Sequence, residues 1–289
     1  MSGVRAFLVL LTLVVAPAGA AESDSAGEIM ARVAVKQDAA EKARAAFVYR
    51  QNIAIRLRDA HGHLVREELS EYQVTPGARR TNKELVKFAG RCQKGGSMVA
   101  YATSGKDKDD GFREEADSSL AHNLRDDLTG DRKSKDGVAP ELFPLTARQQ
   151  RKYRFTMQGE ETYRGTKVYR IAFAPKDHKP LLDMDDDDPP WSGEALIGKT
   201  DFQPMQISTR LARKVPFLVR TALGTNVPGL GFSIEYQKFD KDVWFPVSYG
   251  AEFRIHVLFV YSRQISISLD NSDFRRAEVQ TAVQFENVP

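Results

Sequence analysis

The sequence contains little cysteine and no long internal hydrophobic run. Cys92 is the only cysteine among 289 residues, which excludes an intramolecular disulfide and leaves stability to a packed core. Beyond residue 20, no segment reaches the roughly 20 consecutive apolar residues that a membrane-spanning helix requires. A hydrophobic content of 42% is nevertheless ordinary for a globular protein. We therefore expect a folded domain whose stability does not depend on cross-links.

An excess of charge of either sign is also missing. The 42 Lys and Arg residues are balanced by 39 Asp and Glu residues, and the two signs are mixed along the chain. This balance indicates no basic surface for nucleic acid. The sequence has no Gly-x-Ser-x-Gly, no His-Glu-x-x-His and no phosphate-binding loop. These absences favour a non-catalytic protein without a cofactor. A hydrolase stays an alternative, because glycosidase carboxylates cannot be recognised in a single sequence.

Three groups of residues carry metal-binding or nucleophilic side chains, and each has a simpler interpretation. His61 and His63 flank a glycine in a turn with no third ligand nearby, so a solvated turn is favoured over a metal site. The acidic run 183–188 lacks the spacing of a calcium loop and precedes two prolines, which favours a solvated loop. Cys92 has no evident catalytic partner. We expect no metal site and no catalytic residue.

Residues 1–20 have the three parts of a secretory signal peptide. Arg5 gives a short basic region, residues 6–16 are uncharged and mostly apolar, and residues 18–20 supply the small side chains of a cleavage site. The apolar run is too short to span a bilayer, which favours cleavage over retention as an anchor. We therefore expect export across the inner membrane and a soluble periplasmic protein, with residues 21–289 forming one domain.

The mature chain is predicted to start with one helix and to continue mainly as strands. Ser25 and Glu28 have the spacing of a capping box, which predicts a helix over 26–45. From Phe47 onward, apolar residues recur at every second position, as in strands with one buried face. The segments with this alternation are 47–58, 64–74, 153–157, 168–173, 194–199, 203–213, 230–239 and 245–269. The pattern predicts an α+β fold that is mainly antiparallel β.

Four segments need separate interpretation. The strand 64–74 is rich in Arg and Glu, which predicts that one of its faces is exposed. Residues 82–88 fit either a strand or a short helix. Residues 91–140 are rich in turn-forming and charged residues and predict a long, partly mobile connection, with one short helix behind Asp117-Ser118. Residues 271–273 predict a turn.

The segment 215–223 interrupts the alternation. Pro216 suits a first helical position and Gly224 a helix end. The segment is therefore either a short helix that covers an opening in a curved sheet, with Phe217 and Leu218 as its lid residues, or a piece of the core.

One helix, long antiparallel strands and a helix between later strands together resemble a known architecture. The stretches that carry the resemblance are Phe47-Val-Tyr-Arg-Gln-Asn-Ile53, Leu142-Phe-Pro-Leu-Thr146 before Tyr153, and Gly193-Glu-Ala-Leu-Ile-Gly-Lys-Thr-Asp-Phe-Gln-Pro-Met205. They resemble the LolA/LolB type of periplasmic lipoprotein carrier, a fold shared by the N-terminal domain of the RseB/MucB regulators. The resemblance spans nearly all of the mature chain and rests on pattern. It implies a curved, unclosed β-barrel, or half-barrel, with short lid helices over an apolar cavity that holds acyl chains.

The expected cavity residues follow from the alternation in this chain itself. Central strands of a curved sheet face its hollow, and an incompletely covered apolar hollow suits a hydrophobic ligand. The aromatic residues that we expect to line it are Tyr153, Phe155, Phe232, Tyr249 and Phe253.

Three functional hypotheses follow in order of preference. The first is an exported, non-catalytic protein that binds a lipid or a lipoprotein acyl chain in the half-barrel cavity, as a carrier or sensor. The second is an interaction module of the cell envelope that binds another protein through its sheet edge or long loop. The third is a secreted hydrolase. The expected partners are a hydrophobic ligand and an envelope protein, without nucleic acid and without a membrane span after cleavage.

Overall fold

Eleven strands and three helices make up the described part of the chain. The computed structural model describes residues 25–76, 81–102, 112–129, 145–177, 191–212, 231–239, 243–257 and 261–277. The strands in these ranges are β1 (Phe47–Arg58), β2 (Leu64–Thr75), β3 (Asn82–Lys94), β4 (Ser97–Tyr101), β5 (Tyr153–Tyr163), β6 (Thr166–Pro175), β7 (Trp191–Gly198), β8 (Pro204–Leu211), β9 (Ser233–Phe239), β10 (Val243–Val257) and β11 (Tyr261–Arg276). The helices are α1 (Ala26–Arg44), α2 (Phe112–Thr129) and α3 (Ala147–Gln150). None of these helices is long and apolar enough to cross a bilayer.

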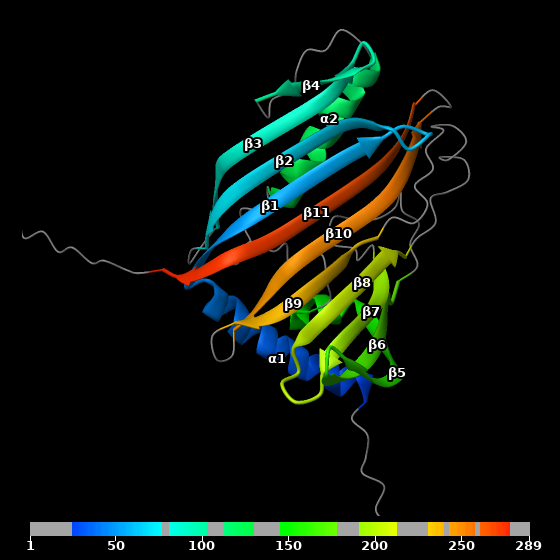
Figure 1. The fold of residues 1–289 in the computed structure, drawn as a ribbon. Coiled ribbons are helices and arrows are strands. Elements are labelled where there is room, and N and C mark those ends of the chain that lie inside the picture. The colour runs from blue at the N-terminus through cyan, green and yellow to red at the C-terminus, as the bar shows by residue number, and fades with distance from the viewer. Residues whose placement is uncertain are drawn as a thin grey trace, which may run out of the picture.

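All eleven strands belong to one antiparallel sheet, which is not closed into a barrel (Figure 1). The order across the sheet is β4-β3-β2-β1-β11-β10-β9-β8-β7-β6-β5. Neighbours in this order are also neighbours in sequence, except at β1 and β11, which pair from Phe47↔Arg276 to Arg58↔Gln264. The predicted α+β fold, mainly antiparallel and unclosed, is confirmed.

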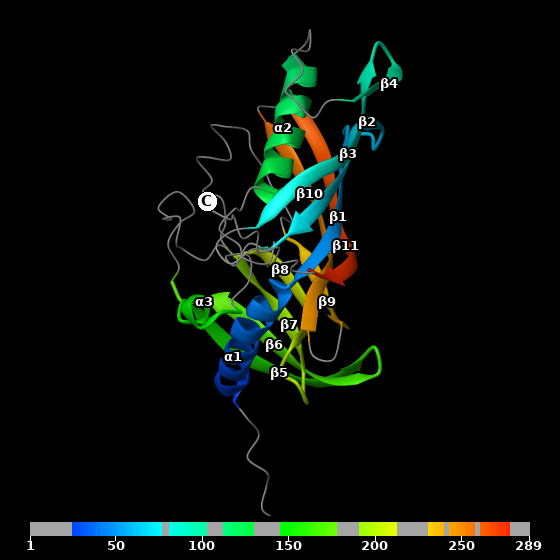
Figure 2. The same cartoon turned by 90° about the vertical axis from the view of Figure 1, so that its left-hand side faces the viewer.

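The first helix begins where the sequence predicts it. The Ser25 hydroxyl accepts a hydrogen bond from the Glu28 amide at 3.3 Å, and the Glu28 carboxylate accepts one from the Ser25 amide at 2.8 Å. This capping box satisfies two amides at the helix start. The buried residues of α1 form one stripe, which consists of Ala26, Ile29, Met30, Val33, Ala34, Gln37, Ala40 and Arg44. α1 contacts β5, β10 and α3, and Figure 2 shows the three helices on the same side of the sheet.

Burial in β1 follows the predicted period of two, with the odd-numbered residues buried and the even-numbered residues more exposed. We call the side of the sheet on which the helices lie the inner face and the opposite side the outer face. Paired residues of antiparallel strands point to the same face. Ile55 of β1 is paired with Glu68 of β2 and with Ile267 of β11, so these three residues share the inner face.

The segment 91–140 contains more regular structure than the sequence predicts. The end of β3, all of β4 and all of α2 lie within it, and the ambiguous residues 82–88 are part of β3. α2 starts at Phe112 and not near Asp117. The reason is that Asp117 and Ser118 are buried and bonded to side chains of the sheet, so they are anchors of the helix and not its cap.

The turn predicted at 271–273 is wrong, because these residues lie inside β11. Here the register shifts, so that Asp273 and Phe274 of β11 stand opposite the single residue Tyr49 of β1. Asp273 has a φ of 55°, a left-handed conformation that Asp tolerates better than most residues. The turn-forming residues therefore make a β-bulge, and Phe274 packs against Phe245 with ring centroids 4.3 Å apart.

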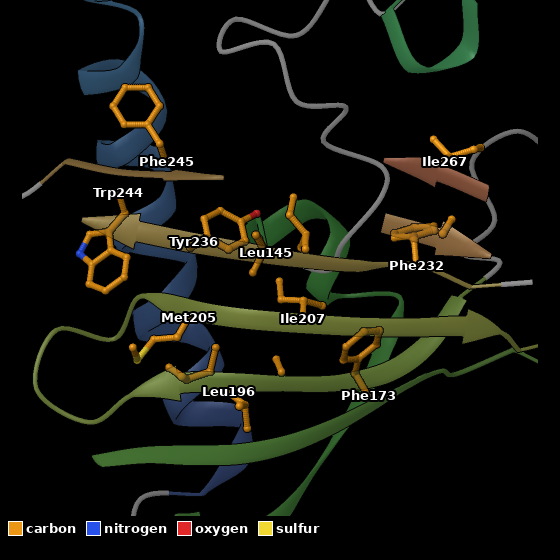
Figure 3. Packing of buried hydrophobic residues seen from close by; sticks show 14 of the residues in the cluster. Leu145, Phe173, Leu196, Met205, Ile207, Phe232, Tyr236, Trp244, Phe245 and Ile267 are labelled. Carbon is orange, nitrogen blue, oxygen red and sulfur yellow. The ribbon is translucent and has the colours of Figure 1, made fainter. Parts of the chain in front are cut away.

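The hydrophobic core lies between the inner face and the helices. Figure 3 shows buried side chains of β6 to β10 in one cluster, with α1 passing behind these strands. Labelled members of this cluster include Phe173, Ile207, Phe232, Tyr236 and Phe245. α1 is thereby fixed to the half of the sheet that contains β5 to β10.

Candidate functional site

The inner face divides into two regions of different chemistry. The first, the apolar region, lies on β5 to β10 and contains Tyr153, Phe155, Phe173, Trp191, Phe232, Tyr249 and Phe253. The second, the charged region, is formed by residues of β2, β11 and α2, namely Arg66, Glu68, Asp117, Arg125 and Arg263. Figure 1 shows α2 behind β1 to β3 and α1 behind the opposite end of the sheet.

The nominated cavity residues lie in the apolar region and form separate contacts there. Phe232 and Tyr249 have ring centroids 5.2 Å apart, and Trp191 packs against Phe232 at 4.7 Å. Tyr153 and Phe155 of β5 stack on each other at 6.5 Å. The structure thus brings two pairs of the nominated residues together. Whether they line a cavity stays a prediction.

Three of the nominated residues keep part of their surface exposed. Phe155, Tyr249 and Phe253 are partly buried and pack against the core cluster. Burial raises the pKa of Tyr249, so its hydroxyl is neutral at physiological pH. The expected lid residues Phe217 and Leu218 lie outside the described residues. A partly covered apolar surface of this kind can accept a further apolar group.

In the charged region, Glu68 of β2 accepts hydrogen bonds from three side chains. Arg66 donates to it at 3.1 Å, the Tyr101 hydroxyl donates at 2.8 Å, and Arg125 of α2 also donates. Tyr101 reaches Glu68 by crossing Gly90, where a Cβ atom would lie 2.3 Å from the tyrosine ring. Glu68 and Arg66 are nearly inaccessible to solvent, so these partners compensate for the desolvation of both charges.

Asp117 of α2 is held by two residues of β11. The Arg263 Nε donates to Oδ1 at 2.7 Å, and Nη2 donates to Oδ2 at 2.9 Å, which makes a bidentate pair. The Tyr261 hydroxyl donates to Oδ1 at 2.6 Å. The next residue, Ser118, accepts a hydrogen bond from Arg66 at 3.3 Å. α2 is therefore attached to β2 and to β11 through polar side chains.

The protonation states of this region follow from its burial and its carboxylates. Burial raises the pKa of Tyr261, and the charge of Asp117 raises it further. Burial likewise raises the pKa of Tyr101, together with the charge of Glu68. For Arg263, burial disfavours the charged form, but the hydrogen bonds and charge of Asp117 outweigh it and the pKa is raised. Both tyrosines are therefore neutral donors, and Arg263 is a cation.

The sequence pattern does not predict the charged region, because the charges of β2 favour an exposed face. Arg66 is 1% exposed and Glu68 is 4% exposed. A signal was present, since Arg66 and Glu68 alternate in phase with Val74, a buried residue of the same strand. On α2, Asp117 and Arg125 are two helical steps of four residues apart, so they share one face.

The histidines considered as metal ligands lie in the same turn as Asp59, a carboxylate close enough to Arg263 to raise its pKa. His61 and His63 are exposed in the turn between β1 and β2, and His63 Nδ1 lies 3.1 Å from Asp59. Within the described ranges, no group of three or more His, Cys, Asp or Glu residues could hold a metal ion. The acidic run 183–188 lies outside these ranges.

No family model matches the chain, and a search of curated proteins finds no match. Among solved structures, the chain is similar to a LolA superfamily protein from Nitrosomonas europaea, with 13% identity, coverage of 89% of this chain and 96% of that one, and a TM-score of 0.36. A DUF1329 family protein from Desulfovibrio piger has 11% identity, coverage of 90% and 96%, and a TM-score of 0.39. MucB has 10% identity, coverage of 87% and 94%, and a TM-score of 0.25.

Proposed function

We propose that this protein is exported to the periplasm and binds the acyl chain of a lipid or lipoprotein between its inner face and its helices. In this role it is a non-catalytic carrier or sensor. Export rests on the signal-peptide pattern of residues 1–20, which lie outside the described residues. The binding energy comes from apolar burial, at about 0.8 kcal/mol for each methylene group removed from water.

The observation that carries this proposal is a set of large apolar side chains that the core covers only in part. They come from β5, β10 and β11, and they are Phe155, Met157, Tyr249, Phe253 and Leu269. Each packs against the buried cluster and keeps some exposed surface. An acyl chain laid against them would remove this surface from water, which is favourable in proportion to the apolar area covered.

α2 is the element that best provides an entrance. Among its described side chains, those that pack in the apolar core are Ala121, which is buried, and Leu120 and Leu124, which are partly buried. Its described polar side chains are anchored by hydrogen bonds and ion pairs, which exchange with water at little net cost once they are solvated, and Arg125 also lies over the Phe88 ring. Movement of α2 away from β1 and β11 would expose the inner face next to Phe253, while α1 keeps the rest of the core in place.

Two measurements test this proposal directly. Native mass spectrometry of protein purified from the periplasm is expected to show co-purifying lipid. Delipidated protein is expected to take up a fluorescent fatty acid with micromolar affinity. Protein that stays empty in both assays would refute lipid binding. A panel of ester and glycoside substrates tests the hydrolase alternative, which the described residues do not specifically support.

A substitution that fills the inner face sharpens the test. Ala251 lies on the inner face of β10, paired with Ile267 of β11. Ala251→Trp is expected to abolish fatty-acid uptake, because the indole occupies the space of the acyl chain. Ala54→Trp on the outer face of β1 is the matched control and should keep uptake. Circular dichroism verifies that both variants fold, and Phe253→Ala tests the same site if the tryptophan is not tolerated.

Protein binding is a second candidate function, favoured by the β3–β4 end of the sheet. β4 is an edge strand of the sheet, and its neighbour is β3. Large apolar side chains are exposed there, namely Leu85, Val86, Met98 and Val99. An edge strand with exposed apolar residues can pair with a strand of another protein. Periplasmic cross-linking from position 98 tests this role, and a partner captured without lipid and retained by Ala251→Trp would support it.

A further inference from the structure

We infer that Arg263 and Tyr261 form a receptor for the acidic head of an amphiphile, a carboxylate or a phosphate. When no ligand is bound, the carboxylate of Asp117 of α2 occupies this receptor. The inference rests on the proposed function and adds the head-group class to it. The ligand would then be an amphiphile with an anionic head and an apolar tail, and its head would compete with the protein's own carboxylate.

The geometry around Asp117 is that of an anion-binding site. Three donors converge on one carboxylate, two from Arg263 at 2.7 and 2.9 Å and one from Tyr261 at 2.6 Å. All three residues are less than 10% exposed, so the contact is shielded from water. A planar guanidinium fork matches both carboxylate and phosphate oxygens. The same donors would therefore fit the head of a fatty acid or of a phospholipid.

The receptor belongs to the sheet, whereas its present occupant belongs to the helix. Arg263 and Tyr261 are two residues apart on β11, so both point to the inner face. Arg263 also donates from Nη1 to the carbonyl oxygen of Ser262 at 2.8 Å, a bond that does not involve α2. The guanidinium therefore keeps an anchor on its own strand when α2 moves, and its fork stays available for another anion.

The inner face continues from this receptor as an apolar track. The next inner-facing residues of β11 are Ile265 and Ile267, which are buried in the core cluster, and Leu269, which is partly buried. Ile265 is paired with Phe253 of β10. From Arg263 to Leu269 the strand rises by about 20 Å, at roughly 3.4 Å per residue. A ligand with its head on Arg263 would place its tail along this track and onto the partly buried side chains of the proposed acyl site.

A second arginine of the sheet approaches the same place from β2. Arg66 donates to Ser118, the neighbour of Asp117 on α2, at 3.3 Å. The charge of Arg66 also lowers the pKa of Tyr261 and so partly offsets the increase that Asp117 causes. A head group that displaces Asp117 and Ser118 of α2 would meet Arg263 first and Arg66 beside it, which favours an anionic head over a neutral one.

The experiment compares two probes that differ only in the head. Delipidated protein is titrated with a dansyl-labelled fatty acid and with its methyl ester. The acid is expected to bind about tenfold more tightly, as one charge-assisted contact implies. Arg263→Gln should remove this preference, because it should lower the affinity for the acid and leave the affinity for the ester unchanged. Asp117→Asn should raise the affinity for the acid severalfold, because the side chain that competes with the head group loses its charge.

Controls separate a head-group receptor from a structural ion pair. Arg56→Gln removes an ion pair with Glu67 on the outer face, at 2.7 Å, and should leave both affinities unchanged. Tyr261→Phe removes one donor while preserving the ring, and it should lower the affinity for the acid. This variant tests the receptor if Arg263→Gln does not fold. Inorganic phosphate is added as a tail-less anion and should compete with the acid only at much higher concentration.

Each outcome decides the inference. Equal binding of acid and ester, unchanged in Arg263→Gln and Tyr261→Phe, would overturn the receptor while leaving acyl binding intact. Inorganic phosphate that competes as well as the fatty acid would show a free-anion site and overturn the amphiphile. Failure of every variant to take up either probe would overturn the proposed function together with this inference. A preference for the acid that is lost in Arg263→Gln and enhanced in Asp117→Asn would support it.

Discussion

The two ends of the inner face hold their helices by different physical means. α1 buries a stripe of mostly apolar side chains against β5 and β10, whereas Asp117 and Arg125 of α2 reach the sheet through ion pairs. Apolar packing is non-directional and proportional to area, while a buried ion pair must first recover the desolvation of both charges. α1 is thus held mainly by apolar packing, whereas α2 joins the core through Ala121 and is held in addition by buried ion pairs.

The largest expected effect lies in the apolar half. Phe245 of β10 is 1% exposed and contacts Phe47, Phe239 and Phe274, with ring centroids 4.3 to 5.8 Å away. Phe245→Ala leaves a cavity and should lower the free energy of unfolding by about 4 kcal/mol. Urea denaturation followed by tryptophan fluorescence measures this loss. Val35→Ala, at a position of α1 that is 70% exposed, is the control, with a change within about 0.5 kcal/mol.

The next largest effect should be confined to the charged half. Arg263→Met leaves Asp117 buried without its bidentate partner, which costs about 3 kcal/mol. Because Ala121 is the one described residue of α2 that is buried in the core cluster, hydrogen exchange should show lost protection in α2 and unchanged protection in α1. The double variant Arg263→Met and Asp117→Leu should recover most of the loss. Equal deprotection of both helices would contradict this difference between α1 and α2.

A smaller effect is expected from Tyr261→Phe, which removes one hydrogen bond to Asp117 and should cost about 1.5 kcal/mol. The pKa of Tyr261 is raised above its ordinary value of 10.0, first by burial and then by Asp117, so the fold favours the neutral hydroxyl. Its contribution is complete below about pH 10 and is lost as the pH rises further, since the unfolded chain releases this proton first.

Urea midpoints measured at neutral pH and at about pH 11 test the sign of this effect. The difference between the native protein and Tyr261→Phe should shrink at the higher pH. Tyr101 and Tyr249 also have raised pKa values, so their contributions to the stability of the fold decrease with pH in the same direction. Both residues are present in the native protein and in Tyr261→Phe, so their effect cancels in the difference. A difference that grows with pH would contradict the assignment of a neutral, hydrogen-bonded Tyr261.

The smallest effect concerns the start of α1. Ser25→Ala removes the capping bond to the Glu28 amide and should cost about 1 kcal/mol, because the stripe of buried residues holds the helix independently of its cap. Thermal unfolding by circular dichroism measures the change, with Ser25→Asp as a control that retains a capping group. A loss comparable to that of Phe245→Ala would mean that α1 is held by its end and not by its face.

Local structure could be predicted where one short-range signal decides it. Ser25 and Glu28 determine the start of α1, and the alternation from Phe47 determines β1. These signals act within a few residues, so no distant part of the chain can override them easily. The bulge at Asp273 shows the limit, because the same residue types that form a turn also tolerate a left-handed residue inside a strand.

Long-range features could not be predicted in the same way. Alternation shows which residues share a face, but it does not show which strand lies beside which, so it does not predict the pairing of β1 with β11. The burial of Arg66 depends on Ser118, 52 residues further along the chain. Charged residues are buried only when such partners arrive. The cavity lining and the lid at Phe217 and Leu218 stay predictions.

The pairing of β1 with β11 also concerns the order in which the protein can fold. A side-chain hydrogen bond across this pair joins Gln51 to Asn271, 220 residues apart. The middle of the sheet therefore forms only after nearly all of the described chain has become available, and closing so long a loop is slow. Until then β1 has one edge without its native partner, and such an edge invites aggregation. Under the proposed export to the periplasm, this edge of β1 is the place where a chaperone would be needed most.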